Sequence, residues 1–265
     1  MRLVLVGAAM CLPLMACAEE NLVSNPGFEQ GAERWGLINN WYAPEGKQAS
    51  PGVIDDAAAH SGRASLRIDG QGSRGLAIQS PVPVEAGQKY RLSCWMRGES
   101  MGEVRAGPLI EFWSEEQGHL GGKFIAREVP AQWERLSEVT YAPVGSDYAK
   151  IMCATQTENE GRVWFDDVGV SAAVPPPPVH PELADDTLVW EDYEAPPSVA
   201  YYRVYASEQP FESVALMTAA EWLPADSRSL SMARVGADAQ WVAVVAVDED
   251  DMENPRVEPV EVRPQ

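Results

Sequence analysis

The sequence predicts an all-β protein that folds as two sandwiches, and three observations support this prediction. The 265 residues include 21 glycines, 21 prolines and nine tryptophans, a composition typical of many strands joined by tight turns. Apolar and polar residues alternate over short runs, as they do in strands with one buried face. No stretch keeps a 3.6-residue apolar period long enough for a substantial helix.

The amino terminus has the pattern of an export signal over residues 1–18. A basic start precedes an apolar run at 3–17 that is too short for a confident membrane span, and acidic residues begin at Glu19. Two processing sites stay open: cleavage before Glu19, or a lipoprotein signal at 14–17 that leaves Cys17 lipidated as the new amino terminus. We therefore expect an exported protein that is secreted, periplasmic or lipid-anchored at the cell surface.

Short strand-like runs fill the first segment of the chain. They cover residues 64–69, 89–97, 109–113, 133–141, 149–155 and 162–170. In the third run, alternation places Ile110 and Phe112 on one face and Glu111 and Trp113 on the other. Many short strands over about 150 residues predict a two-sheet sandwich or jelly roll.

Export also bears on the cysteines. Cys94 and Cys153 remain outside the signal region, an even pair for an oxidising compartment. Both lie in strand-like runs, so they form a disulfide or pack as two buried thiols. The sequence leaves both alternatives open.

A proline-rich run, VPPPPVHP at 174–181, divides the chain. Consecutive prolines cannot extend a sheet and favour an extended, semi-rigid spacer. We expect one domain at 21–173, this linker, and a second domain at 182–265.

The net charge of −20 comes from 40 acidic and 20 basic residues. It argues against nucleic-acid binding and against electrostatic docking on an anionic membrane, which both need basic surface. The apolar fraction of 45% excludes a disordered acidic tail. Most of the excess acid lies in the second segment, including the DEDD run at 248–251, which we expect to be solvated surface.

Five sequence runs in the first segment resemble a known family when taken in order. They are NLVSNPGFEQGAERWG, HSGRASLRI, VEAGQKYRLSCWMRG, WERLSEVTYAP and RVWFDDVGVS. Together they resemble the carbohydrate-binding modules of family 4/9, the CenC-type group, over residues 21–173. The resemblance implies a galactose-binding-like β-jelly-roll whose partner is a poly- or oligosaccharide.

The second segment resembles a fibronectin type III module, an immunoglobulin-like sandwich. The runs that carry the resemblance are TLVWEDYEAPPSVAYYRVY and AQWVAVVAVD, followed by a short terminal strand. This implies that Trp190 and Trp241 lie in or near a core.

The first resemblance also implies a structural calcium site. Apolar residues flank the pair Asp166 and Asp167, so at least one of these carboxylates is expected to be partly buried with a partner. In the family, an Asp that corresponds to Asp166 binds Ca²⁺ together with a Glu that corresponds to Glu29. Backbone carbonyls of Ser61 and Arg63 complete the expected hard-oxygen set. Hydrogen bonding without an ion is the alternative.

Sugar-binding modules of this kind use aromatic faces that stack on pyranose rings, with polar side chains bonding to hydroxyls. The candidate residues are Trp41, Tyr42, Arg105, Glu111, Trp113 and Gln156. Trp35 and Trp133 are expected in the core, whereas Trp95 and Trp164 could face either way. The glycine-rich run EEQGHLGGK departs from the family pattern, and we expect it to be a loop in which His119 is solvated.

No catalytic residue is predicted. A nucleophile motif of the GxSxG type is absent, and the three histidines do not cluster in the sequence. The leading hypothesis is a non-catalytic carbohydrate-binding protein. The alternatives are a surface module for structure or protein interaction without sugar binding, or an accessory subunit of a glycoside hydrolase system.

Overall fold

The computed structural model describes residues 20–37, 50–70, 75–100, 102–156 and 161–262. These ranges contain β-strands and one turn of 3-10 helix, Met232–Arg234, and they hold no helix long and apolar enough to cross a membrane. The expected signal at 1–18 with Cys17, and the candidate sugar-binding residues Trp41 and Tyr42, lie outside the described residues.

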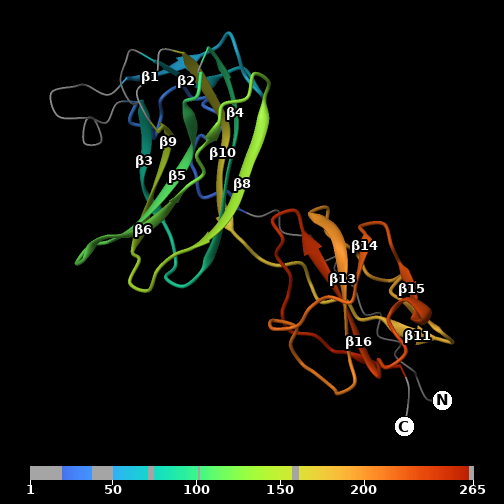
Figure 1. Ribbon diagram of the computed structural model, residues 1–265. Coiled ribbons are helices and arrows are strands. Elements are labelled where there is room, and N and C mark those ends of the chain that lie inside the picture. Colours follow the sequence, from blue (N-terminus) through green and yellow to red (C-terminus); the bar gives the residue numbers. More distant parts are fainter. Residues whose placement is uncertain (1–19, 38–49, 71–74, 101, 157–160, 263–265) are drawn as a thin grey trace, which may run out of the picture.

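Among the described residues, ten strands form the first sandwich. Figure 1 shows its two layers. They are β1 (Gly52–Asp55), β2 (Ser65–Asp69), β3 (Leu76–Pro83), β4 (Lys89–Glu99), β5 (Arg105–Ser114), β6 (Gly118–Phe124), β7 (Arg127–Glu128), β8 (Glu134–Tyr141), β9 (Tyr148–Thr155) and β10 (Arg162–Ala172). One sheet has the order β1-β2-β10-β4-β8. The other has the order β3-β9-β5-β6, with β7 also paired to β5, and all pairs are antiparallel.

The two sheets enclose one apolar core. Side chains from both sheets alternate into it, including Leu66, Leu92, Phe112, Ile151 and Phe165. Cys94 of β4 and Cys153 of β9 lie in the same core as free, buried thiols, so of the two alternatives the structure shows the unpaired one. Burial raises the pKa of both thiols, which keeps them protonated.

In the second sandwich, the described part of the chain forms seven strands. They are β11 (Glu182–Ala184), β12 (Thr187–Val189), β13 (Val199–Ser207), β14 (Glu221–Pro224), β15 (Ser229–Ser231), β16 (Trp241–Asp248) and β17 (Val260–Glu261). Sheets of order β11-β12-β15 and β14-β13-β16-β17 pack around their own core. Trp190 and Tyr202 are buried there, as expected for Trp190, while Trp241 is half-buried.

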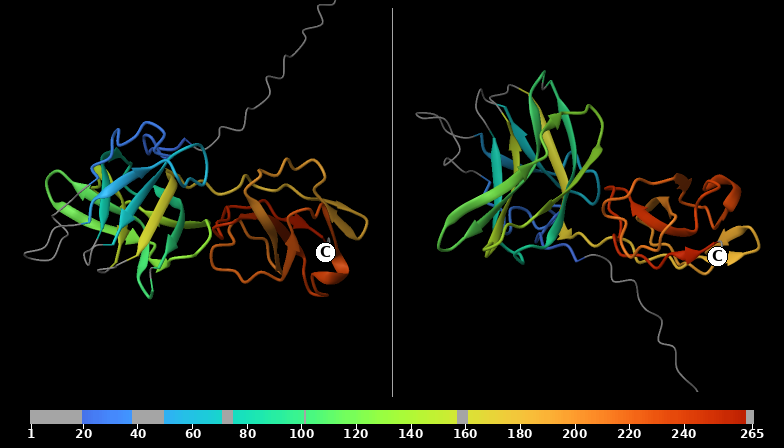
Figure 2. Two further views of the ribbon diagram at one scale, coloured as in Figure 1. Left: turned by 90° about the horizontal axis from the view of Figure 1, so that it is seen from above. Right: turned by 60° about the horizontal axis from the view of Figure 1, so that its bottom comes forward.

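The two sandwiches meet through the acidic turn after β16 (Figure 2). Arg91 of β4 pairs with Asp248, at 2.6 Å between Nη2 and Oδ2, and with Asp250. The Ser137 hydroxyl of β8 donates to Asp250 at 2.9 Å. The expectation that the DEDD run is solvated surface was wrong for Asp248, which is 1% exposed and whose buried charge is met by Arg91.

Candidate functional site

The outer face of the β3-β9-β5-β6 sheet carries the best-formed part of the predicted sugar site. On β5, Ile110 and Phe112 point into the core, so Glu111 and Trp113 face outward, as alternation predicted. Both outward side chains are half-buried.

Trp113 is surrounded by polar side chains from three strands. Its indole Nε1 donates to Glu111 Oε2 at 3.2 Å. The Lys150 ammonium of β9 lies 3.4 Å from the centre of the ring, and the His119 ring of β6 lies 5.4 Å away. This arrangement offers an aromatic face that can stack on a sugar ring and a carboxylate that can bond to its hydroxyls, with the lysine ammonium lying over the face.

Lys150 and His119 were missed by the sequence reasoning. Trp113 of β5 is directly opposite His119 of β6, and Glu111 of β5 is directly opposite Lys150 of β9. Residues directly opposite one another in antiparallel strands have neighbouring side chains, so only the register brings these groups together. The sequence signal was the outward position of each residue on its own strand.

Residues 118–123 of the glycine-rich run belong to strand β6 and do not form the expected loop, and residues 115–117 form the turn before it. β6 pairs with β5 along its length, and a Cβ on Gly122 would lie 2.3 Å from the carbonyl oxygen of Ile110. Only glycine allows this approach, which explains why a strand here lacks the usual β-forming residues. His119 is exposed, as expected, but it lies beside Trp113.

An apolar band crosses the same outer face beside Glu111. Its members come from β3, β5, β6 and β9: Leu76, Ile78, Leu109, Phe124, Met152 and Ala154. Trp113 therefore lies at one end of a face that is apolar in its middle.

Arg105 and Gln156 lie at the far end of this sheet. The Gln156 backbone N–H donates to the Arg105 carbonyl at 2.7 Å, and the Arg105 guanidinium donates to the Ala126 carbonyl at 2.6 Å. Trp113 lies eight positions further along β5 than Arg105, about 26 Å of extended chain. The structure therefore brings together Glu111 and Trp113, and separately Arg105 and Gln156, but it does not unite the two pairs.

The four predicted calcium ligands come together at one end of the sandwich. Glu29 Oε1 accepts bonds from the backbone N–H groups of Arg63, at 2.7 Å, and Ala64, at 3.0 Å. Asp166 Oδ2 accepts from the N–H of His60 at 2.7 Å and of Ser61 at 3.1 Å.

Both carboxylates thus serve as acceptors for backbone donors. Burial raises the pKa of Asp166, with N–H bonds acting in the opposite direction, and the bond from Arg63 lowers the pKa of Glu29. Carboxylate and carbonyl oxygens suit a hard cation such as Ca²⁺. Among the described residues, however, no group of three or more His, Cys, Asp or Glu side chains could hold a metal ion.

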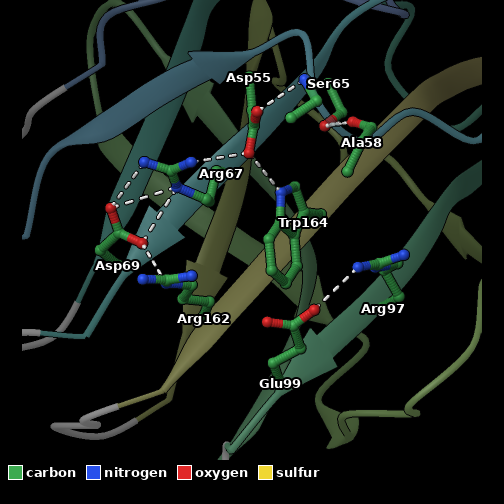
Figure 3. A network of polar contacts seen from close by, with 10 residues as sticks. Asp55, Ala58, Ser65, Arg67, Asp69, Arg97, Glu99, Arg162 and Trp164 are labelled. Carbon is green, nitrogen blue, oxygen red and sulfur yellow. Dashed lines mark hydrogen bonds and ion pairs between the residues drawn. The ribbon is translucent and has the colours of Figure 1, made fainter.

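On the outer face of the β1-β2-β10-β4-β8 sheet, Trp164 lies within an ionic network (Figure 3). The Trp164 indole donates to Asp55 at 2.8 Å, and the Arg97 guanidinium lies 4.7 Å from the centre of the Trp164 ring. Arg67 joins Asp55, at 2.8 Å, to Asp69. Trp164 is only 4% exposed, so this face leaves none of its ring for a ligand.

Two further tryptophans and a histidine lie beside that network. His60 stacks on Trp95 with ring centres 3.7 Å apart, and it meets the edge of Trp133 at 6.0 Å. The expectation that Trp133 is a core residue was wrong. Its ring is half-buried on this outer face, 5.8 Å from the Arg97 guanidinium, because Trp133 precedes β8 and is not held by its alternation.

Several solved structures are similar to the chain. One is a family 16 carbohydrate-binding module, with 17% identity, a TM-score of 0.44, and coverage of 57% of this chain and 99% of the other. Another is TmCBM61 in complex with β-1,4-galactotriose, with 19% identity, a TM-score of 0.41, and coverage of 58% and 99%.

A third similar structure is the enzymatically active domain of tailspike protein 4 from bacteriophage CBA120. It has 15% identity, a TM-score of 0.47, and coverage of 58% of this chain and 21% of the other.

No curated protein matches the chain by sequence. The fibronectin type III resemblance of the second segment stays a prediction. The resemblance of the first segment is confirmed, because residues 20–150 match the model of carbohydrate-binding module family 4/9, described as a carbohydrate binding domain.

Proposed function

We propose that this protein is an exported, non-catalytic carbohydrate-binding protein whose first sandwich holds a neutral glycan on the outer face of the β3-β9-β5-β6 sheet. The observation that carries the proposal is the position of Trp113, half-buried on that face within a segment that matches a carbohydrate-binding family. The ring stacks on a pyranose face once the Lys150 ammonium moves aside, while Glu111 and His119 bond to hydroxyls.

The second sandwich, interpreted as a fibronectin type III-like module, places the first one at a fixed distance from an anchor or partner. The signal at 1–18 exports the chain, with Cys17 as a lipid anchor if the lipoprotein processing site is used. Metabolic labelling with a fatty acid tests the anchor, and a mature protein without label excludes it.

A glycan array followed by calorimetry tests sugar binding. The array should hold neutral oligosaccharides, including xylohexaose and β-1,4-galactotriose. We expect binding of at least one of them, and a weakening of about tenfold in Trp113→Ala, equivalent to about 1.4 kcal/mol.

Tyr141→Ala supplies the matched control, because Tyr141 is an aromatic residue of the same sandwich that is 64% exposed and lies on β8 of the other sheet. Its affinity should equal that of the wild type. A protein that binds no oligosaccharide on the array would instead be a structural or protein-interaction module. Equal losses in both variants would place the site elsewhere.

We also propose that Ca²⁺ binds between Glu29 and Asp166, with carbonyls of Ser61 and Arg63. The backbone bonds already bring these residues together, so an ion would join the start of the domain to β10. A chelator should lower the melting temperature of the wild type, since an ion that binds only the folded state stabilises it. Glu29→Gln should remove that response. An unchanged melting temperature with chelator would show that hydrogen bonds alone join these segments.

A further inference from the structure

The second sandwich exposes one tryptophan whose surroundings set it apart from the other exposed apolar residues. Trp222 is 56% exposed on β14, the edge strand of its sheet. Tyr201 of β13 stacks beside it, with ring centres 5.1 Å apart and planes inclined by 14°. The two residues therefore present nearly parallel rings at the edge of the domain.

A cation lies against this pair of rings. The guanidinium of Arg203 is 4.8 Å from the centre of the Trp222 ring and 5.5 Å from that of Tyr201. Arg203 is 14% exposed at its side chain, so it lies on the protein side of the indole. Cation–π attraction holds the ring in one orientation.

Two carboxylates hold the guanidinium. Arg203 Nη2 donates to Asp251 Oδ1 at 2.5 Å, and Arg203 Nη1 pairs with Glu253 Oε2 at 3.2 Å. Tyr201 also donates its hydroxyl to Asp251. The hydrogen bond from Arg203 lowers the pKa of Asp251, so this network stays charged at neutral pH.

This arrangement suits a sugar ring better than a protein surface. The orientation of Trp222 is set before a ligand arrives, which reduces the entropy lost on binding. A stable protein interface needs about 800 Å² on each partner, much more than one indole face. Asp251 is 67% exposed at its side chain, and no described residue bonds to its second oxygen, Oδ2, which can accept a bond from a hydroxyl.

We propose that the Trp222–Tyr201 pair is a second carbohydrate-contact site, which takes the apolar face of one pyranose ring of a neutral polysaccharide. A ring stacks on the exposed face of Trp222, and Asp251 accepts a bond from one of its hydroxyls. The contact does not depend on the site of the first sandwich. When both sites hold one chain, the second contact is intramolecular and adds avidity.

Affinity electrophoresis through gels that contain xylan, β-1,4-galactan or mixed-linkage β-glucan tests the site. On the polymer that retards the wild type most, we expect Trp222→Ala to weaken binding about three- to tenfold, and Trp222→Phe to weaken it less. Binding of a short oligosaccharide by the first sandwich should be unchanged in Trp222→Ala. Leu216→Ala is the control, because Leu216 is fully exposed in the same domain and should have no effect.

The outcomes separate the two sites. If Trp222→Ala behaves as wild type while Trp113→Ala loses binding, the second site is refuted and the proposed function stands. If Trp222→Ala loses binding while Trp113→Ala does not, the second site stands and the first is refuted. No retardation of the wild type on any polymer overturns both. Dimerisation of the wild type in sedimentation, abolished by Trp222→Ala, would assign the ring to self-association instead.

Discussion

The two outer faces of the first sandwich both carry tryptophan beside a cation, yet they differ in how those groups are held. On the β1-β2-β10-β4-β8 face, Trp164 is buried and its indole N–H bonds to Asp55, which Arg67 also holds. On the β3-β9-β5-β6 face, Trp113 is half-buried and a single lysine ammonium lies over its ring.

This difference separates an aromatic residue that stabilises a fold from one that can meet a ligand. The Trp164 ring contacts the guanidinium of Arg97, and its N–H bonds to the carboxylate of Asp55. Each of these two groups also has an ion-pair partner, Glu99 for Arg97 and Arg67 for Asp55. A sugar would therefore have to break several contacts at once to reach the ring. The lysine over Trp113 has a flexible stem and can move away at small cost. The number of aromatic residues on a face is therefore a weaker indication of sugar binding than the mobility of the charged side chains that lie over their rings.

Replacing the buried ring should have the largest effect on stability. Trp164→Ala removes a large side chain and leaves the Asp55 carboxylate without one donor, so we expect a loss of about 3–5 kcal/mol in the free energy of unfolding. Trp113→Ala should cost about 1 kcal/mol. Urea denaturation followed by circular dichroism measures both. The comparison fails if the two variants lose equal stability.

The acid response of the network should give the next largest effect. Burial alone would raise the pKa of Asp55, but bonds from Trp164, Ala57 and Arg67 outweigh it and the pKa is lowered. The carboxylate therefore adds stability above the unfolded-state pKa of about 3.9, and this stability is lost as the pH falls through the folded-state value.

Asp55→Asn tests this response. We expect the variant to be less stable than the wild type by about 1–3 kcal/mol at pH 7. The gap should shrink below about pH 4, where the wild-type carboxyl takes up a proton. Urea denaturation at pH 7 and pH 3.5 measures it. Glu99→Gln removes a carboxylate that is paired with Arg97 at the surface, and it should change stability at pH 7 by less than about 1 kcal/mol. A gap for Asp55→Asn that is constant with pH would contradict the assignment.

Local patterns in the sequence were sufficient for the all-β class and for the orientation of single residues. Alternation placed Phe112 and Trp113 on opposite faces, and Phe112 is the one in the core; the apolar residues around Asp166 and Asp167 predicted that at least one of them is partly buried, and Asp166 is buried. These predictions succeed because a strand has two faces and the core takes one of them.

What depends on the pairing of distant segments was not accessible from the sequence. Lys150 meets Trp113 only through the β5–β9 register, and β6 is a strand although its glycines favour a loop. The burial of Asp248 required the position of Arg91 on another domain. Trp133 was expected in the core by analogy with a family position, whereas it precedes β8 and lies beside Arg97 on the outer face of the sheet.

Removing the Lys150 ammonium that lies over Trp113 should have the smallest effect. It tests most directly whether the mobility of that cation distinguishes the two faces. A sugar that stacks on Trp113 must displace the ammonium 3.4 Å from the ring centre, at a cost of about 0.5–1 kcal/mol. Lys150→Ala should therefore tighten oligosaccharide binding by about two- to fivefold, as measured by calorimetry. Lys123→Ala is the control, because that lysine of β6 pairs with Glu138 and should leave the affinity unchanged. Weaker binding by Lys150→Ala would show that the ammonium bonds to the sugar and that it is a ligand of the site and not its cover.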